Sequence, residues 1–286
     1  MRKLVLLICL VFSSSFIYTG DASKIKVPKD IDARSLCPKD GGHFEHVVVV
    51  IDITTGLQQP QIDFIKSHVF SNEFYESYQP FTRFSYLLID NTAPQSQKYV
   101  VSKCRTKTGY ETNYKGDKFT SDESKLYVQG FYKKFKKSMS SSSNKIFSST
   151  GKGSNGSLIY ETIATVFSSP QLNFTDSQKK RTLIIVSDMM QNSNRLSFYK
   201  YCKKSVFNSV PNECPPFSKL FEDESLKDYI ETSSPKNESA VINIIYMNHN
   251  YETLRTLDKS LISLWVDYFK HTGFRNINLI RQLDLN

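Results

Sequence analysis

The sequence predicts an α/β fold in which helices cover both faces of an open, mostly parallel central sheet. Two segments, residues 46–54 and residues 181–188, each contain a run of aliphatic side chains that reaches an aspartate. A strand that is apolar on both faces is typical of the interior of a parallel sheet. Amphipathic helical segments alternate with such strands along the chain, as expected when helices pack on both faces of the sheet.

The first residues have the pattern of a secretory signal peptide. Arg2 and Lys3 precede the apolar run Leu4–Phe12, and small residues before position 23 offer a cleavage site. The run is too short to span a bilayer comfortably, and an uncleaved amino-terminal anchor is the alternative. We expect a secreted or periplasmic protein with no membrane span in the mature chain. The predicted units are a signal peptide at residues 1–22, a polar lead-in segment at residues 23–45 and one domain at residues 46–286.

The first half of the domain is predicted to contain three strands and two helices. Its first strand occupies residues 46–54, and Pro60 suits the first turn of the helix that follows. Apolar residues then recur three and four positions apart, as on one side of a helix: Ile62, Ile65, Val69, Phe70 and Phe74. Further along we predict strands at residues 81–89 and 99–104, a polar loop at residues 105–122 and a helix at residues 123–138.

The second half is predicted to begin with a serine- and glycine-rich loop at residues 138–157. An amphipathic helix at residues 158–167 then leads to the strand at residues 181–188. Residues 189–239 are polar and predicted to be irregular, apart from a short helix at residues 218–229. The remaining predicted elements are a strand at residues 240–247, a helix at residues 259–270 and a closing strand at residues 278–283.

The cysteines indicate disulfide bonds, because an even number in an exported chain is typical of them. Cys9 lies in the predicted signal peptide, which leaves Cys37, Cys104, Cys202 and Cys214. The short spacing from 202 to 214 favours a stapled loop, with the other two cysteines as the second pair. Four cysteines allow three connectivities, so this pairing is a hypothesis. Neither a CxxC motif nor a histidine-rich cluster indicates zinc.

The formal net charge of the chain is +9, and its densest basic cluster is Lys133–Lys137. Apolar residues around this cluster recur at helical spacing, which favours the solvated face of an amphipathic helix. A nucleic-acid-binding or lipid-binding patch is the alternative. We expect no nucleic-acid partner.

The sequence does not indicate an enzyme. The glycine-rich stretch at residues 151–154 lacks the spacing of a phosphate-binding loop, and no nucleophile elbow stands out. His43 and His46 precede the first strand, where we interpret them as ordinary surface histidines. They would lie at the opposite end of the sheet from a ligand site and are therefore poor general bases.

Three oxygen-rich segments are predicted to meet at one edge of the sheet. The first strand ends in Asp52-Ile-Thr54-Thr-Gly56, a polar loop ends at Ser157 just before a helix, and a later strand ends in Ser-Asp188. Ligands of open parallel sheets bind at the carboxyl ends of the strands. A few carboxylates with several hydroxyls suit Mg²⁺ or Mn²⁺ with retained water molecules.

These segments resemble the metal-ion-dependent adhesion site of von Willebrand factor type A domains. That family has a D-x-S-x-S motif after the first strand, a hydroxyl residue before a later helix and an aspartate after a later strand. Asp52 and Thr54 match the motif, Ser157 matches the second position and Asp188 matches the third. Gly56 departs from the pattern, because it stands where the second motif hydroxyl belongs. The segments SDMMQNS and SLIYETI further resemble an exported bacterial branch of unknown activity.

The resemblance implies a Rossmann-like sheet and a protein-binding module. Such a module grips an acidic group of a protein ligand through a divalent cation, here Mg²⁺ or Mn²⁺. Asp52, Thr54, Ser157 and Asp188 would be the metal ligands, directly or through water. The alternative, favoured by Gly56, is a metal-independent docking or scaffold component of a bacterial envelope or transfer apparatus.

Overall fold

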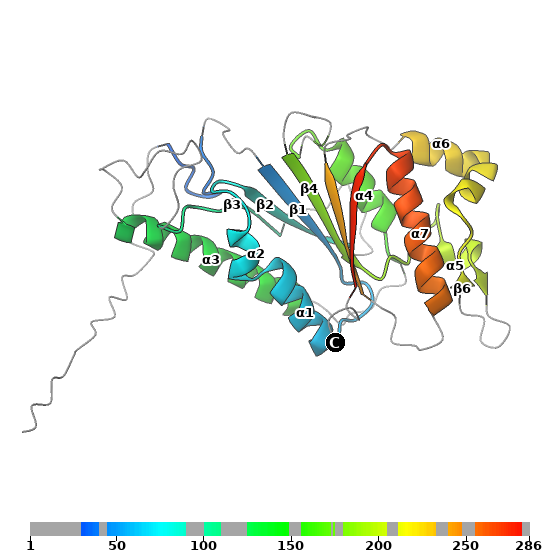
Figure 1. Ribbon diagram of the computed structural model, residues 1–286, viewed down its shortest axis with the longest axis horizontal. Helices are drawn as coiled ribbons and strands as arrows, with labels where there is room; N and C mark the ends of the chain where they lie inside the picture. The colour runs from blue at the N-terminus through cyan, green and yellow to red at the C-terminus, as the bar shows by residue number, and fades with distance from the viewer. Residues whose placement is uncertain are drawn as a thin grey trace, which may run out of the picture.

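The protein was analysed as a computed structural model (Figure 1), which describes ten segments of the chain. They are residues 30–39, 45–89, 100–109, 125–148, 156–172, 174, 180–204, 211–232, 240–247 and 255–281. The predicted signal peptide, His43 and most of the predicted loop at residues 105–122 lie outside them.

A mostly parallel sheet forms the centre of the molecule. Among the described residues it has six strands in the order β3-β2-β1-β4-β7-β8. Every pairing is parallel except that of β2 with β3. The strands are β1 (Glu45–Asp52), β2 (Arg83–Ile89), β3 (Val101–Cys104), β4 (Lys180–Ser187), β7 (Val241–Tyr246) and β8 (Asn276–Arg281). The predicted fold class is confirmed, and each predicted strand is present with ends shifted by up to two residues.

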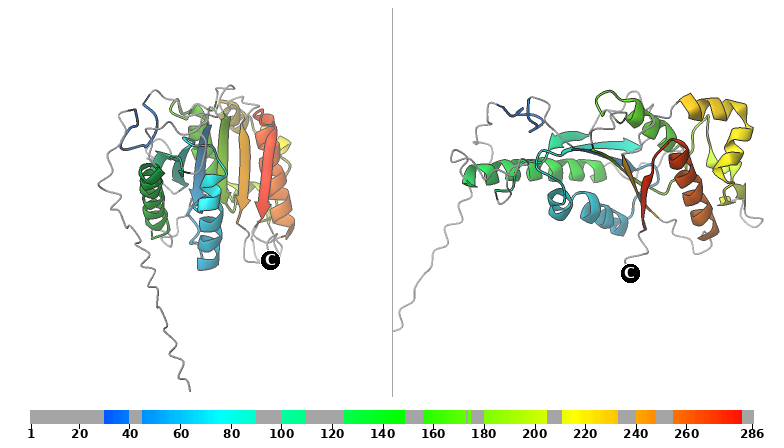
Figure 2. Two further views of the ribbon diagram at one scale, coloured as in Figure 1. Left: turned by 60° about the vertical axis from the view of Figure 1, so that its left-hand side comes forward. Right: turned by 45° about the horizontal axis from the view of Figure 1, so that its top comes forward.

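Helices cover both faces of this sheet (Figures 1 and 2). Val47, Val49 and Ile51 of β1 point into a core shared with the helices of one face, whereas Val48 and Val50 point into the opposite core. The first face carries α1 (Gln59–Val69), α2 (Asn72–Glu76) and α3 (Lys125–Ser148), and the second carries α4 (Ile159–Ser168), α6 (Glu224–Thr232) and α7 (Arg255–His271). Burial on both faces explains why β1 is a continuous aliphatic run.

The predicted first helix is two helices. α1 ends at Val69, and α2 begins after Ser71, whose hydroxyl accepts a hydrogen bond from the Phe74 amide at 3.1 Å. A serine in this position caps a helix start, so the chain turns although the apolar spacing continues. Phe74 therefore packs from α2.

The prediction of a loop from residue 138 is wrong, because α3 continues to Ser148. Met139, Ile146 and Phe147 extend its buried stripe, and tertiary packing outweighs the weak helix preference of serine. The hydroxyl of Ser142 donates to the carbonyl oxygen of Ser138, four residues earlier. A serine hydroxyl can make its hydrogen bond within a helix in this way, by donating to a backbone carbonyl one turn earlier. The structure describes this helix from Lys125.

The stretch predicted as irregular at residues 189–239 holds several short elements. They are α5 (Phe198–Tyr201), β5 (Lys203–Lys204), β6 (Pro211–Glu213), the 3-10 helix η3 (Phe217–Glu222) and α6. The predicted helix at 218–229 is divided between η3 and α6. Outside this stretch, α7 is longer than the predicted helix at residues 259–270, because it extends from Arg255 to His271.

Two disulfides tie peripheral segments to the sheet and its helices. Cys37 bonds Cys104 with an S–S distance of 2.02 Å, and Cys202 bonds Cys214 at 2.00 Å. These are the pairs that the spacing favoured. The first holds the lead-in against the edge strand β3, where the Cys104 amide donates to the carbonyl oxygen of Ser35 at 2.8 Å. Covering an edge strand protects it from pairing with other chains.

No helix in the described part of the chain is both long enough and apolar enough to cross a membrane.

Candidate functional site

The strand order places a ligand-binding position between β1 and β4. The chain runs outward from β1 to β2 in one direction and from β4 to β7 and β8 in the other. Helices leave the two strands toward opposite faces at this reversal, which opens a crevice at the carboxyl ends of the strands. Asp52 ends β1 and Asp188 follows β4, so both lie at this position. It is at the lower end of the sheet in Figure 1, where β1 leads into α1.

Asp52 is the centre of a buried hydrogen-bond cluster. Its Oδ1 accepts hydrogen bonds from the Thr54 amide at 3.0 Å and the Thr54 hydroxyl at 2.6 Å. Its Oδ2 accepts from the hydroxyls of Ser157 and Ser187, both at 2.8 Å. Only 4% of Asp52 is exposed to solvent. We call Asp52, Thr54, Ser157, Ser187 and Asp188 the acid–hydroxyl cluster.

The second carboxylate acts on the first electrostatically. Burial, together with the negative charge of Asp188, raises the pKa of Asp52 to about 6, although hydrogen bonds from Thr54 and Ser157 oppose the increase. Asp188 is half-buried, and it accepts a hydrogen bond from the Met190 amide at 2.9 Å. Two carboxylates whose negative charges interact in this way favour either a shared proton or a bound cation.

The backbone at Asp188 is held in an uncommon conformation. Met189 has φ of 61°, in the left-handed region that a non-glycine residue rarely adopts. The Met189 amide donates to the Ser187 hydroxyl at 2.8 Å, and Trp265 of α7 donates to the Met189 carbonyl oxygen at 2.9 Å. Such conformations persist where the surroundings enforce them, and they gather at functional sites.

Ser157 is placed by pairing with the segment after β4. Its amide and carbonyl exchange hydrogen bonds with those of Asn192, at 3.0 and 2.8 Å. Gly156 permits this approach, because a Cβ atom at that position would lie 3.2 Å from the Asn192 carbonyl oxygen. Gln191 adds a second link, since its side-chain oxygen accepts from the Tyr160 amide in the first turn of α4 at 2.7 Å. The Ser157 loop and the β4 loop therefore form one rigid rim.

Tyr199 lies at the border of this rim. It is on α5, two residues after Ser197, which pairs with Asn192 and so with the Ser157 loop. Burial and the charges of Asp188 and Asp52 raise the pKa of the Tyr199 phenol, yet 42% of the residue is exposed. The stapled hairpin of β5 and β6 follows α5 directly in the chain.

The structure brings the four predicted site residues near one another. Asp52, Thr54 and Ser157 are joined by hydrogen bonds, and Asp188 acts on Asp52 through its charge. Ser187 was not among the predicted site residues. Its position immediately before Asp188, at the end of a buried strand, is the only sequence signal that could have found it.

The oxygen atoms of the cluster fit a hard cation. Thr54 and Ser157 both direct their hydroxyl hydrogens to Asp52, which leaves lone pairs on both oxygens. The Ser187 hydroxyl both donates and accepts, so we interpret it as positioning Asp52. Within the described segments, no three residues among His, Cys, Asp and Glu gather as a potential metal site. A site here would therefore have few carboxylates, as Mg²⁺ and Mn²⁺ tolerate.

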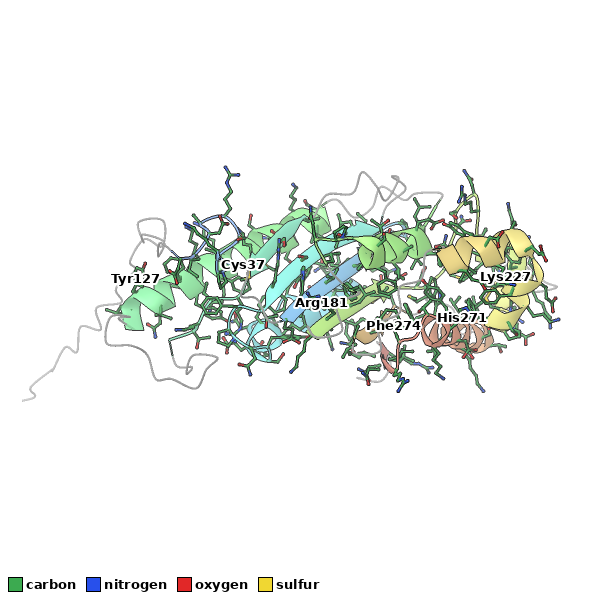
Figure 3. All side chains as sticks on the ribbon, turned by 90° about the horizontal axis from the view of Figure 1, so that it is seen from above. Cys37, Tyr127, Arg181, Lys227, His271 and Phe274 are labelled. Carbon is green, nitrogen blue, oxygen red and sulfur yellow. A yellow bond between two sulfur atoms is a disulfide. The ribbon has the colours of Figure 1, made fainter. Side chains whose placement is uncertain are left out.

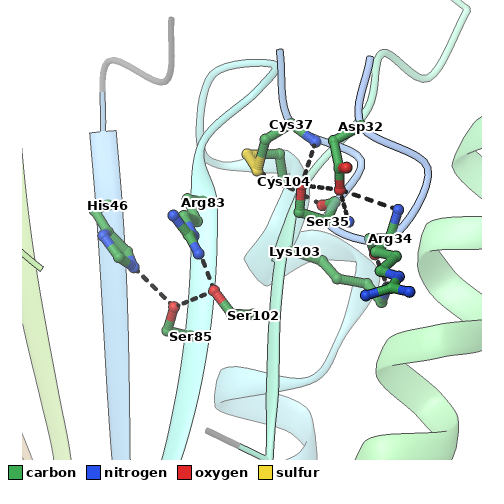
Figure 4. The surroundings of a disulfide bond; sticks show 10 residues. All are labelled: Asp32, Arg34, Ser35, Cys37, His46, Arg83, Ser85, Ser102, Lys103 and Cys104. Atoms are coloured by element: carbon green, nitrogen blue, oxygen red, sulfur yellow. Dashed lines mark hydrogen bonds between the residues drawn. A yellow bond between two sulfur atoms is a disulfide. The ribbon is translucent and has the colours of Figure 1, made fainter. Parts of the chain in front are cut away.

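His46, interpreted from sequence as a surface residue, is buried with 1% exposure. Figure 4 shows it at the start of a chain of hydrogen bonds across three strands. His46 Nε2 lies 2.8 Å from the Ser85 hydroxyl, which lies 2.7 Å from the Ser102 hydroxyl, and Arg83 Nε donates to Ser102 at 2.8 Å. A histidine beside a serine can form a nucleophile–base pair, but Ser85 is completely buried and no substrate could reach it.

A cavity of about 80 Å³ lies elsewhere, between the lead-in, the turn before β2, the segment after β3 and α3. Its walls include Ile31, Phe81 and Phe131, and it contains none of the cluster residues. It has room for no more than a few water molecules. The chemistry of Asp52, and not this cavity, marks the candidate site.

Comparison with known proteins does not assign the chain to a family. No family model and no curated protein sequence matches it. Among solved structures it is similar to proximal thread matrix protein 1 from the mussel byssus, with 11% identity over 84% of this chain and 44% of that one and a TM-score of 0.39. It is also similar to a von Willebrand factor type A protein from Catenulispora acidiphila, with 11% identity over 80% and 42% and a TM-score of 0.31. The chain thus spans less than half the length of each.

Proposed function

We propose that this protein is a binding module whose acid–hydroxyl cluster holds a divalent cation, Mg²⁺ or Mn²⁺, and through it an acidic group of a partner protein. One observation carries the proposal. Asp52 accepts hydrogen bonds from hydroxyls in three separate segments of the chain, and the negative charge of Asp188 raises the pKa of Asp52. Asp52, Thr54, Ser157 and Asp188 would hold the ion, whose remaining coordination position would accept a partner carboxylate.

The surroundings of the cluster suit recognition of a protein. Tyr199 presents an exposed aromatic ring beside the two carboxylates, and aromatic rings are common in protein interfaces. The stapled hairpin that follows α5 in the chain carries the exposed Lys204, and Lys203, whose ammonium pairs with Glu213 at 3.2 Å. Positive charge there would attract an acidic partner. Loops held on a rigid scaffold are frequent sites of recognition.

A second candidate function is metal-independent docking or scaffolding in a cell envelope or transfer apparatus. It is favoured by Gly56, which supplies no hydroxyl where the von Willebrand factor type A motif has one. It is also favoured by the hydrogen bonds to both Asp52 oxygens, which already satisfy that carboxylate without an ion.

Isothermal titration of the purified protein with Mg²⁺ and with Mn²⁺ separates the two functions. We expect saturable binding at one site, abolished by Asp52→Ala and by Asp188→Asn. Asp63→Asn removes an exposed carboxylate on α1 and is the matched control, which should bind the cation as the wild type does. If neither Mg²⁺ nor Mn²⁺ binds, the cation-dependent function is overturned and the metal-independent function remains.

If a cation binds, peptide arrays test the partner chemistry. Glutamate- and aspartate-containing peptides should bind in Mn²⁺ and not in a chelator, and their glutamine and asparagine counterparts should bind in neither condition. Equal binding of the acidic and amide peptides would contradict the role of a bridging ion.

A further inference from the structure

The helix α3 carries most of the excess positive charge of the chain. It contains six lysines and neither acidic residues nor arginines within its 24 residues. Its formal charge is therefore +6, of +9 for the whole chain. None of the cluster residues lies on this helix, so its charge needs a separate explanation.

The charge is concentrated on the solvent face of α3. With 3.6 residues per turn, positions 7, 11, 14 and 18 residues after Leu126 lie on nearly the same line along the helix. That line consists of exposed residues: Leu126, Lys133, Lys137, Ser140 and Asn144. Leu126 is 75% exposed, which is unusual for a large apolar side chain. The face therefore has an apolar tip, a basic middle and an uncharged polar end.

Neighbouring segments add further positive charge beside this face. Lys103 of β3 donates a hydrogen bond to the Arg34 carbonyl oxygen, and Figure 4 shows both side chains next to α3. Burial and the charge of Lys134 lower the pKa of Lys103, although the Asp32 carboxylate opposes this effect. Hydrogen bonds from Ser35 already engage that carboxylate. The lead-in, β3 and α3 thus form one basic surface.

We propose that this basic surface of α3 docks the protein on an anionic lipid bilayer. Lysine is a compact point charge that suits a dense layer of lipid phosphates, and clusters of lysine bind anionic membrane surfaces. The exposed Leu126 adds an apolar side chain that can enter the interface.

Features of the same helix argue against a single-stranded nucleic acid as the occupant. Such ligands stack their bases on exposed aromatic rings. Phe131, Tyr132 and Phe135 of α3 are buried, and Lys136 lies over the Tyr132 ring at 5.0 Å from its centroid. Tyr127 is half-buried and packs on Phe131 at 5.3 Å. The surface therefore offers charge without a stacking platform.

Docking through α3 would leave the other half of the molecule accessible. In Figures 1 and 3, α3 lies at one end of the long axis, and α6, with Lys227, lies at the other. The inference does not depend on the proposed cation site, because no residue is shared between them.

Flotation of the purified protein with lipid vesicles tests the inference. We expect binding to vesicles of phosphatidylcholine with phosphatidylglycerol, no binding to phosphatidylcholine alone, and loss of binding as salt rises from about 0.1 M to about 1 M. Lys133→Gln with Lys137→Gln should weaken binding by about 25-fold, at about fivefold per lysine. Lys227→Gln with Lys270→Gln removes the same charge from exposed positions on α6 and α7, far from α3, and should change binding by less than about twofold.

Two results would overturn the inference. Equal weakening by the two pairs of substitutions would show that net charge alone, and not α3, determines binding. Failure to bind the anionic vesicles at low salt would exclude the bilayer, and binding of a single-stranded oligonucleotide instead would assign the surface to nucleic acid. Circular dichroism of each variant confirms that the substituted helix is folded.

Discussion

Both ends of the central sheet contain a buried polar network, but the two networks differ in charge. At the carboxyl ends of the strands, Asp52 and Asp188 lie within reach of each other's charge and are surrounded by hydroxyls. Toward the amino ends, His46 and Arg83 are connected through two serine hydroxyls (Figure 4). The first network combines two acids with neutral hydrogen-bond donors, whereas the second contains basic groups and hydroxyls.

The difference bears on the proposed cation site. The hydroxyls of Ser85 and Ser102 each have two hydrogen-bond partners within the sheet, and these bonds connect the three paired strands. Asp52 gains hydrogen bonds too, but these do not remove the repulsion from Asp188. A buried carboxylate beside a second, half-buried carboxylate is costly without a counter-ion. On the proposed function, a cation at the carboxyl end would offset this repulsion, whereas the amino-end network contains no pair of carboxylates.

The largest expected effect is on the pH dependence of stability in a chelator. The folded-state pKa of Asp52 is about 6, against an ordinary value of 3.8. Between these values the folded protein binds more protons than the unfolded chain, so the free energy of unfolding falls as pH rises. The loss should be about 3 kcal/mol, complete just above pH 6. Urea unfolding measured at pH values from 4 to 7 checks it.

The comparison supplies controls for that measurement. Asp52→Asn removes the titrating group and should abolish the fall between about pH 4 and pH 6. Ser85→Ala alters only the other network and should leave the slope unchanged. A wild-type slope equal to that of Asp52→Asn would show that the carboxylates at the carboxyl end do not repel one another enough to require an ion.

If the cluster binds a cation, a smaller effect is expected when Mn²⁺ is added at pH 7. Mn²⁺ at 100 times its dissociation constant should stabilise the folded protein by about 2.7 kcal/mol, because it binds only the folded state. Asp188→Asn should lose this stabilisation. His46→Phe should retain it, since the amino-end network contributes nothing to the ion. Thermal unfolding with and without Mn²⁺ gives the comparison, and equal stabilisation of all three proteins would mean that the ion binds elsewhere.

The amino-end network should matter for stability alone. Ser85→Ala removes the hydroxyl between His46 and Ser102, and we expect it to cost about 2 kcal/mol by leaving buried polar groups without that partner. Adding His46→Phe to it should cost less than the sum of the two single changes, because both polar partners are then gone. Urea unfolding of the four proteins measures this coupling. A change in Mn²⁺ affinity in any of them would contradict the separation of the two ends.

The fold and most of the site could be predicted from the sequence because local patterns determine them. The aliphatic run of β1 indicated a buried parallel strand, and Asp52 at its end indicated the edge where ligands bind. The spacing of apolar residues along the chain does not show whether a side chain is buried by a segment far away in the sequence. His46 is buried because Ser85 of the neighbouring strand accepts or donates a hydrogen bond to it, and nothing in the sequence around position 46 shows this.

Other differences arose where tertiary packing overrode local preference. The serines after Lys137 predicted a loop, but Met139 and Ile146 bury their side chains in the core and keep the chain helical. Ser187 could not be recognised as a partner of Asp52, because it points into the cluster only once β4 lies beside β1. Sequence patterns located the strands and their ends, and strand pairing then determined which side chains meet.

The smallest expected effect comes from restoring the hydroxyl that position 56 lacks. Gly56 is exposed and is not among the described glycines with positive φ, which are Gly109 and Gly273, so serine can adopt its backbone conformation. If the acid–hydroxyl cluster binds a cation, Gly56→Ser should add a ligand and raise Mn²⁺ affinity by about fivefold, or about 1 kcal/mol. Titration calorimetry measures the gain, and Thr55→Ser, which keeps a hydroxyl out of register, is the control. An equal gain from both would show that loop flexibility, and not a new ligand, changes affinity. No gain from Gly56→Ser in a protein that binds Mn²⁺ would place the ion away from this loop, toward Asp188 alone.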